Sequence, residues 1–185
     1  MPSCYDEANI QFTSGTTGRP KAAVLSHYNI LNNGYVIGKR MKLSERDNIC
    51  VPVPLYHCFG MILGNLAALT RSAQLTYVCE GFDPQKTMEA VNKYQCSALY
   101  GVPTMFSEYL RVYEENPSKF NIKSLRTGII AGSLAPEILM QKILGTLGIK
   151  EITNCYGMTE TSPVSFQTNT TDTFEQKTQT VGAIL

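Results

Sequence analysis

The sequence predicts an α/β fold in which a parallel sheet is flanked by helices. Two observations predict it: short apolar segments alternate with longer amphipathic ones, and only a few residues connect them. A third is that several apolar segments stop at a glycine or proline, as strands do at a turn. With 185 residues, of which 43% are hydrophobic, the chain is long enough for one domain with its own core.

The chain begins with a predicted hairpin and a capped helix. Two apolar segments, Ile10–Phe12 and Ala22–Leu25, flank a polar tip that contains glycines. Ser26 is a favourable N-cap for a helix over His27–Met41. The spacing predicts that one face of this helix contains Ile30, Leu31, Gly34, Ile37 and Met41.

Strands and helices alternate through the rest of the chain. The predicted strands are Asn48–Pro52, Ala73–Cys79, Ser97–Tyr100, Thr127–Ala131, Glu151–Cys155 and Val181–Leu185. The predicted helices are Met61–Leu69 after a turn at Pro54–Gly60, a helix from Asp83 or Pro84 through Tyr94, Thr104–Glu114 and Ala135–Gly145. The polar, threonine-rich segment Gln167–Thr180 is expected to be an exposed loop or a loosely held hairpin. Ligands of such sheets gather at the carboxyl ends of the strands, which directs attention to the motifs there.

Composition narrows the class of partner. A net charge of +1 gives no reason to expect a nucleic-acid partner, and no run of ~18 apolar residues predicts a membrane span. Met1–Asp6 is too short and too polar for a signal or transit peptide. The six cysteines show no CxxC spacing and lie in apolar segments, so we expect reduced, buried thiols and an intracellular protein.

The polar tip Thr13–Lys21 is the first candidate site. Its glycines allow close backbone approach, its hydroxyls donate hydrogen bonds, and Arg19 and Lys21 add positive charge, a set that suits a polyphosphate. An ordinary solvated turn is the alternative. The loop is not a Walker phosphate loop, which would need glycine at Pro20 and serine or threonine at Ala22.

Two further candidates follow predicted strands. In Asn154–Thr161, an aromatic ring followed by glycine can lie against a flat base, and a nearby hydroxyl and carboxylate can contact phosphate and Mg²⁺. In Ala131–Ser133, the backbone at Gly132 could pack against a purine or an acyl chain. A strand followed by a plain turn is the alternative in both places.

Two segments beside apolar residues contain candidate contacts for an organic substrate. His57 lies in Pro54–His57 and could be either a structural histidine or a substrate contact. Tyr100–Pro103 is a strand end capped by a turn, which is compatible with a place in a substrate pocket.

Thr13–Lys21 resembles the TSGTTGxPK signature of AMP-forming acyl-CoA synthetases and other adenylate-forming enzymes at every fixed position. Ala22 departs from the glycine that is usual after the lysine. Tyr156–Glu160 resembles the YGxTE motif of the same superfamily, and the segments around His57, Tyr100 and Gly132 resemble its other core motifs. The likeness spans almost the whole chain and is strongest to the mitochondrial medium-chain acyl-CoA synthetase group.

The resemblance implies a role for each matching residue. Lys21, Thr159 and Glu160 would be catalytic, with Glu160 also holding Mg²⁺. His57, Tyr100, Gly101 and Gly132 would contact the acyl substrate. The ATP-binding residues would be Thr13, Ser14, Gly15, Thr16, Thr17, Gly18, Arg19, Pro20, Lys21, Ala131, Gly132, Ser133, Tyr156, Gly157 and Thr159.

The implied activity is that of a fatty acid–CoA ligase, with a medium-chain acid expected. Its small-molecule substrates would be the fatty acid, ATP and CoA, with Mg²⁺ as cofactor, and its compartment would be the mitochondrion. We expect residues 1–185 to be an internal fragment, a partial AMP-binding domain within the large N-terminal domain. The small C-terminal domain would be absent and the fragment inactive alone. A non-catalytic nucleotide-binding fragment and an adenylation domain for an aryl or amino acid are the alternatives.

Overall fold

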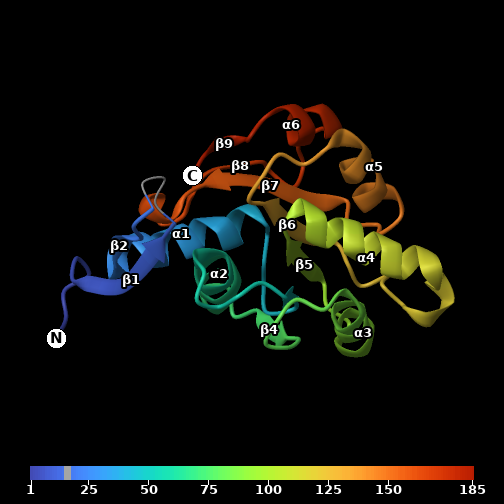
Figure 1. Cartoon of the computed structure of the whole chain (residues 1–185), viewed down its shortest axis with the longest axis horizontal. Coiled ribbons are helices and arrows are strands. Elements are labelled where there is room, and N and C mark those ends of the chain that lie inside the picture. Colours follow the sequence, from blue (N-terminus) through green and yellow to red (C-terminus); the bar gives the residue numbers. More distant parts are fainter. Residues whose placement is uncertain (15–17) are drawn as a thin grey trace.

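The computed structural model describes residues 1–14 and 18–185 and confirms the α/β fold (Figure 1). The described strands form two sheets. One is the antiparallel hairpin of β1 (Glu7–Thr13) and β2 (Lys21–Ser26), and the other has seven strands in the order β4-β3-β5-β6-β7-β8-β9. Figure 1 shows the hairpin at one end of the molecule, with α1 leading from it towards the larger sheet.

The larger sheet is parallel from β4 to β7, whereas β8 and β9 run antiparallel to their neighbours, a change of direction that the sequence did not predict. Its strands are β3 (Asn48–Val51), β4 (Gln74–Tyr77), β5 (Ala98–Gly101), β6 (Thr127–Ala131), β7 (Glu151–Gly157), β8 (Val164–Gln167) and β9 (Ala183–Ile184). The helices are α1 (His27–Arg40), a π-helical segment Phe59–Leu66 continued by α2 (Ala67–Leu69), α3 (Pro84–Tyr94), α4 (Pro103–Glu115), α5 (Glu137–Gly145) and α6 (Phe174–Gln179). Short 3₁₀ turns occupy Pro117–Lys119 and Thr159–Thr161.

The strand order reverses direction at β3. The chain moves outward from β3 to β4, then crosses back to β5 and continues to β6 and β7. Since parallel crossovers are right-handed, the helical segment between β3 and β4 lies on one face of the sheet, and α3, α4 and α5 lie on the other. Reversals of this kind open a crevice at the carboxyl ends of the strands.

The prediction for α1 is confirmed in its cap and in most of its buried face. The Ser26 hydroxyl accepts a hydrogen bond from the Asn29 N–H at 3.2 Å. Gly34 and Ile37 are buried, and a side chain at Gly34 would collide with Leu66, so glycine permits close helix packing here. Leu31 was wrongly placed on this face, because its side of the helix is uncovered and the residue is 52% exposed.

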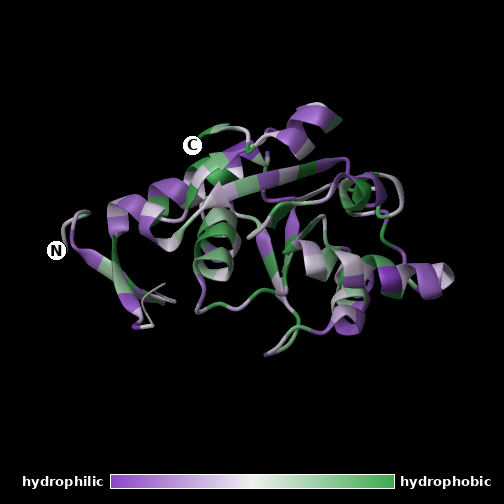
Figure 2. Ribbon diagram, turned by 45° about the horizontal axis from the view of Figure 1, so that its top comes forward, coloured by the Kyte–Doolittle hydropathy of each residue, from purple (hydrophilic) through white to green (hydrophobic). Residues whose placement is uncertain are grey.

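The core lies between the parallel strands and their helices. Every residue of β5 and β6 is buried, as expected for strands covered on both faces. Figure 2 colours the ribbon by hydropathy and shows green, hydrophobic residues on the strands at the centre of the molecule. The expectation of buried thiols is right for Cys50, Cys58, Cys96 and Cys155 and wrong for Cys4 and Cys79, which are exposed. None of the described helices is long and apolar enough to cross a membrane.

The expectation of an exposed loop over Gln167–Thr180 was wrong. Gln167 and Thr168 are fully buried at the end of β8, and Lys177 of α6 is 3% exposed. Several of their polar atoms find partners: Gln167 Nε2 donates to Thr153 Oγ1 at 3.0 Å, and Lys177 Nζ donates to the backbone carbonyls of Lys150 and Thr170. Gln167 Oε1 is buried without a hydrogen-bond partner among the described residues. Polar residues with such partners can be buried at little cost.

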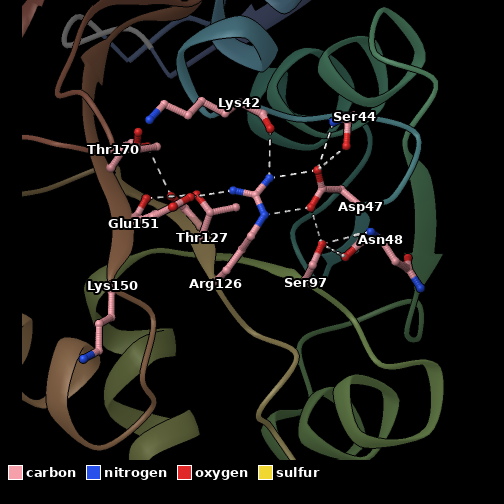
Figure 3. A network of polar contacts seen from close by, with 12 residues as sticks. Lys42, Ser44, Asp47, Asn48, Ser97, Arg126, Thr127, Lys150, Glu151 and Thr170 are labelled. Atoms are coloured by element: carbon pink, nitrogen blue, oxygen red, sulfur yellow. Dashed lines mark hydrogen bonds and ion pairs between the residues drawn. The ribbon is translucent and has the colours of Figure 1, made fainter.

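Arg126 joins the amino ends of the parallel strands in a polar network (Figure 3). Its guanidinium donates to both carboxylate oxygens of Asp47, at 3.0 and 2.8 Å, and to Glu151 Oε2 at 2.6 Å. Burial acts to raise the pKa of Asp47. The hydrogen bonds from Arg126, Ser97 and the Ser44 N–H, together with the charge of Arg126, outweigh burial and lower that pKa below its usual value. The network therefore links the amino ends of the strands, at the end of the sheet opposite their carboxyl ends.

Candidate active site

A cavity of about 470 Å³ lies between the hairpin and the carboxyl ends of the main-sheet strands. It is formed by residues that are far apart in the sequence. The lining residues are Thr13, Ser14, Lys21, His57, Cys58, Phe59, Leu63, Ala131, Gly132, Cys155, Gly157, Met158, Thr159, Glu160, Pro163 and Val164. A cavity of this size can hold a small organic ligand.

The hairpin contributes polar and positively charged groups. Thr13 ends β1 and Lys21 begins β2, and the two face each other across the hairpin. Thr13, Ser14 and Lys21 line the cavity. The predicted residues Gly15, Thr16 and Thr17 lie outside the described part of the chain. Gly18, Arg19 and Pro20 are exposed and are not among the lining residues.

The ends of β6 and β7 supply the opposite wall. Ala131 closes β6, and Gly132 follows with φ = +94°, a left-handed conformation that favours glycine. Gly157 closes β7, where any side chain would clash with the Pro163 carbonyl oxygen. Ala131, Gly132 and Gly157 line the cavity, whereas Ser133 and the half-exposed Tyr156 lie outside its lining. A base-stacking role for Tyr156 stays a prediction.

The 3₁₀ turn Thr159–Thr161 brings a hydroxyl and a carboxylate to the hairpin. Thr13 Oγ1 donates to Glu160 Oε1 at 3.4 Å, which joins residues 147 positions apart. Thr159 Oγ1 lies 3.7 Å from the Cys58 sulfur. The structure thus brings together the three residues predicted to be catalytic, Lys21, Thr159 and Glu160, as lining of one cavity.

A backbone hydrogen bond fixes which nitrogen of the His57 ring carries the proton. Its Nδ1 accepts a hydrogen bond from the Phe59 N–H at 3.0 Å, so the neutral ring carries its proton on Nε2. Partial burial lowers the pKa of His57, which favours that neutral form. Of the other predicted acyl contacts, Gly132 lines the cavity, whereas Tyr100 and Gly101 do not. Tyr100 is fully buried with its hydroxyl 3.3 Å from Met41 Sδ, and Gly101 is also buried. Their contact with an acyl group stays a prediction.

Seven lining residues were not identified from the sequence: Cys58, Phe59, Leu63, Cys155, Met158, Pro163 and Val164. Phe59 and Leu63 are four residues apart in the apolar stretch after His57, a spacing that could have indicated a shared helical face. Burial raises the pKa of the Cys58 thiol, so this group is neutral at physiological pH. Phe59 and Leu63, which follow His57 in the chain, add apolar side chains to the lining of the cavity.

Comparison with known proteins identifies the family. The model of the family described as AMP-binding enzyme matches residues 2–185. The chain therefore belongs to the AMP-binding enzyme family.

Its relatives include acyl-CoA ligases. Acyl-CoA ligase SID4 of Ajellomyces capsulatus is 45% identical over 183 residues, covering 99% of this chain and 31% of that protein. Medium-chain acyl-CoA ligase ACSF2, mitochondrial, of Bos taurus is 44% identical over 187 aligned residues, covering 99% and 30%. The chain is homologous to these AMP-forming enzymes and spans about 30% of the length of each.

Solved structures share the fold. MatB from Rhodopseudomonas palustris with bound ATP superimposes with a TM-score of 0.83 at 24% identity, covering all of this chain and 35% of that one. A long-chain-fatty-acid–CoA ligase from Archaeoglobus fulgidus gives a TM-score of 0.83 at 22% identity, covering 95% and 35%. At this level of identity the likeness shows the fold alone.

Proposed function

We propose that the chain is the nucleotide-binding part of a fatty acid–CoA ligase, with a medium-chain acid as the expected substrate. In the first step a carboxylate oxygen would attack the α-phosphorus of ATP, the bond to the β-phosphate would break, and pyrophosphate would leave. In the second step the CoA thiol would lose its proton, attack the acyl carbon and displace AMP. The observation that carries the proposal is the convergence of Lys21, Thr159 and Glu160 on one cavity.

The polar end of the cavity suits a triphosphate. Lys21 supplies positive charge, Thr13 and Ser14 supply hydroxyl donors, and Thr159 lies where it could orient the reacting phosphate. Glu160 would hold Mg²⁺, which would neutralise phosphate charge when bound. In residues 1–14 and 18–185 no three His, Cys, Asp or Glu side chains gather as a metal cage. Mg²⁺ usually takes one or two carboxylates and completes its shell with phosphate oxygens and water, so a single glutamate fits this ion.

The apolar end suits an aliphatic acid. Phe59 and Leu63 line the cavity together with His57. Within residues 1–14 and 18–185 the Nε2–H of His57 has no hydrogen-bond partner, so it could donate to a carboxylate or acyl oxygen. A neutral donor would orient the carboxylate without quenching its nucleophilicity as a full positive charge would. The bovine relative's name specifies a medium-chain acyl-CoA ligase, and a similar acid is proposed here on that likeness.

ATP–pyrophosphate exchange with a panel of carboxylic acids tests this function in the full ligase that we propose contains the chain. Medium-chain fatty acids should support exchange, and thioester should form when CoA is added. Exchange with aryl or amino acids in place of fatty acids would assign the chain to another adenylating enzyme.

The Lys21→Ala variant should slow exchange at least tenfold, because a cation would be lost from the phosphate end of the cavity. Lys39→Ala is the matched control, since Lys39 lies exposed in the last turn of α1, outside the cavity. Unchanged exchange in Lys21→Ala would refute the assignment of the loop.

We further propose that residues 1–185 form part of an AMP-binding domain and that the small C-terminal domain of the ligase lies outside this chain. The chain alone should then bind ATP with Mg²⁺ in calorimetry without forming acyl-CoA. Formation of acyl-CoA by the chain alone would contradict this division. An intracellular, mitochondrial location is proposed from the bovine relative's name, and cell fractionation tests it.

A further inference from the structure

The two halves of the proposed active site belong to different sheets. Lys21 and Thr13 are on the β1–β2 hairpin, whereas Thr159 and Glu160 follow β7 of the seven-stranded sheet. Their relative position therefore depends on contacts between side chains and loops instead of on a shared strand ladder. The Thr13–Glu160 hydrogen bond is long, at 3.4 Å, and solvent-exposed, so it is a weak constraint.

Helix α1 is firmly attached to the hairpin. It follows β2 without a linker, and Ser26 both ends β2 and caps the helix. The N–H groups of His27 and Tyr28, in its first turn, donate to the carbonyls of Asp6 and Cys4 at 3.2 and 2.7 Å, which ties the helix to the segment leading into β1. Any group that α1 holds is thus held at a fixed place relative to Lys21.

Asn33 of α1 holds the chain directly after the Thr159–Glu160 turn. Its Nδ2 donates to the Val164 carbonyl at 2.9 Å, and its Oδ1 accepts from the Val164 N–H at 3.1 Å. The amide therefore satisfies both backbone groups of Val164, as a neighbouring strand would. Val164 is 5% exposed, so its backbone has little access to water as an alternative partner.

Val164 is one end of a tight loop that carries both catalytic groups. It pairs with Gly157 across β7 and β8, and Met158–Pro163 spans the distance between them. The loop is closed by the Met158 N–H donating to the Pro163 carbonyl at 3.0 Å, and Thr161 Oγ1 donates to the same carbonyl at 2.6 Å. A group that fixes Val164 consequently fixes the position of Thr159 and Glu160.

A second residue of α1, Arg40, also holds the helix against the end of the chain that includes β8. Arg40 donates to the carbonyls of Gln167, Ala183 and Ile184 at 2.7 to 2.9 Å. From Asn33 to Arg40 the helix rises about 10.5 Å, and from Val164 to Gln167 a strand advances about 10 Å. The two residues thus hold matching points of β8, which sets α1 alongside this strand.

We propose that Asn33 is a positioning residue of the adenylation site, which holds the Thr159–Glu160 turn at the correct distance from Lys21. This inference rests on the proposed function and adds to it a residue outside the cavity lining. Asn33 touches neither ATP nor the acid, and it acts through Val164.

The test compares Asn33→Ala with Asn32→Ala in the full ligase. Asn32 is the neighbouring residue on the same helix, and its Nδ2 donates to the Tyr28 carbonyl within α1, at 2.7 Å. Both variants gain the same helix propensity, so that effect cancels. Asn33→Ala should lower kcat for ATP–pyrophosphate exchange about 10-fold to 100-fold, because misplaced groups slow positioning-dependent chemistry. Asn32→Ala should stay within about twofold of the parent. Asn33→Asp, which keeps the acceptor and loses the donor, should resemble Asn33→Ala.

A double-variant cycle separates positioning from general destabilisation. In a Glu160→Gln background, Asn33→Ala should lower kcat by a much smaller factor than it does in the parent, because the carboxylate that Asn33 positions is already absent. An undiminished loss in that background, or a kcat for Asn33→Ala within twofold of the parent, would overturn the proposal.

Hydrogen exchange gives a readout that does not need activity. In the parent protein the Val164 N–H should exchange its hydrogen slowly. In Asn33→Ala the N–H groups of Val164 and Met158 should exchange at least tenfold faster, whereas the exchange rates of the N–H groups in β6 should not change. If the parent fails to catalyse ATP–pyrophosphate exchange with any acid, the proposed function fails. The hydrogen-exchange rate of the Val164 N–H still decides whether Asn33 holds this loop. Equal Val164 exchange in the parent and Asn33→Ala would refute the contact.

Discussion

Replacing Arg126 with Gln should destabilise the protein more than any comparable change at an exposed arginine. The Asp47 side chain is only 5% exposed, whereas that of Arg126 is 33% exposed. Removing one partner of a buried pair costs about 3–5 kcal/mol because the remaining charge stays buried without compensation. Since solvent reaches part of Arg126, we take the lower end, about 3 kcal/mol. For a domain of this size that corresponds to a fall in Tm of about 6–12 °C.

Arg111 provides the matched control. It forms two ion pairs on α4, with Glu108 at 2.9 Å and Glu115 at 2.6 Å, but all three side chains are about half exposed. Arg111→Gln should therefore lower the stability much less than Arg126→Gln does, because exposed ion pairs contribute little. Urea denaturation followed by circular dichroism at pH 7 measures both variants. In an Asp47→Asn background, Arg126→Gln should cost less, since no buried charge is left behind. The reasoning is refuted if Arg126→Gln loses no more stability than Arg111→Gln.

Three further predictions concern acid stability, the loop after β7 and the thiols. Because the folded pKa of Asp47 is lowered, its stabilisation should be present above the unfolded pKa of about 3.9 and lost as the pH falls through the folded value. Urea titration should therefore show the stability gap between the parent and Asp47→Asn narrowing steadily as the pH falls below about 3.9, and a gap that does not narrow would contradict this. Gly157→Ala should cost about 1–3 kcal/mol and weaken ATP binding, because the new side chain would displace Pro163; calorimetry showing an unaltered Kd would contradict this. Under brief alkylation, mass spectrometry should find Cys4 and Cys79 labelled well before the four buried thiols, and equal labelling of all six would contradict the burial pattern.

Elements with strong local signals could be predicted from the sequence. Strand β6 has the bounds Thr127–Ala131 that its apolar run predicts, and α3 begins at Pro84 with Asp83 as its cap. Both depend on neighbouring residues alone: a β-branched run in one case, and a capping side chain next to proline in the other.

Features that depend on distant partners could not be predicted. The burial of Gln167 requires Thr153 on another strand, and the polarity of the segment gave no sign of that partner. Leu31 has the periodicity of a buried residue but faces an uncovered side of α1. The π-helical geometry of Phe59–Leu66 is likewise invisible in an apolar run, which predicts only that a helix is buried.

The candidate site was predictable in its chemistry and less so in its extent. The motifs around Lys21 and Glu160 indicated a shared phosphate site, and both residues line one cavity. Cys58 and Val164 were missed because neither belongs to a polar motif, and Asn33 was missed because its partner is a backbone 131 positions away.

The measurement that tests the central claim most directly is ATP binding, in the presence of Mg²⁺, to the parent, Lys21→Ala, Glu160→Ala and the double variant by calorimetry. If the hairpin and the turn after β7 form one phosphate site, each single change should raise Kd at least fivefold. The double variant should lose less ATP-binding free energy than the sum of the two single losses, as expected for groups that act on the same ligand. A Kd within twofold of the parent in either single variant would contradict a shared site.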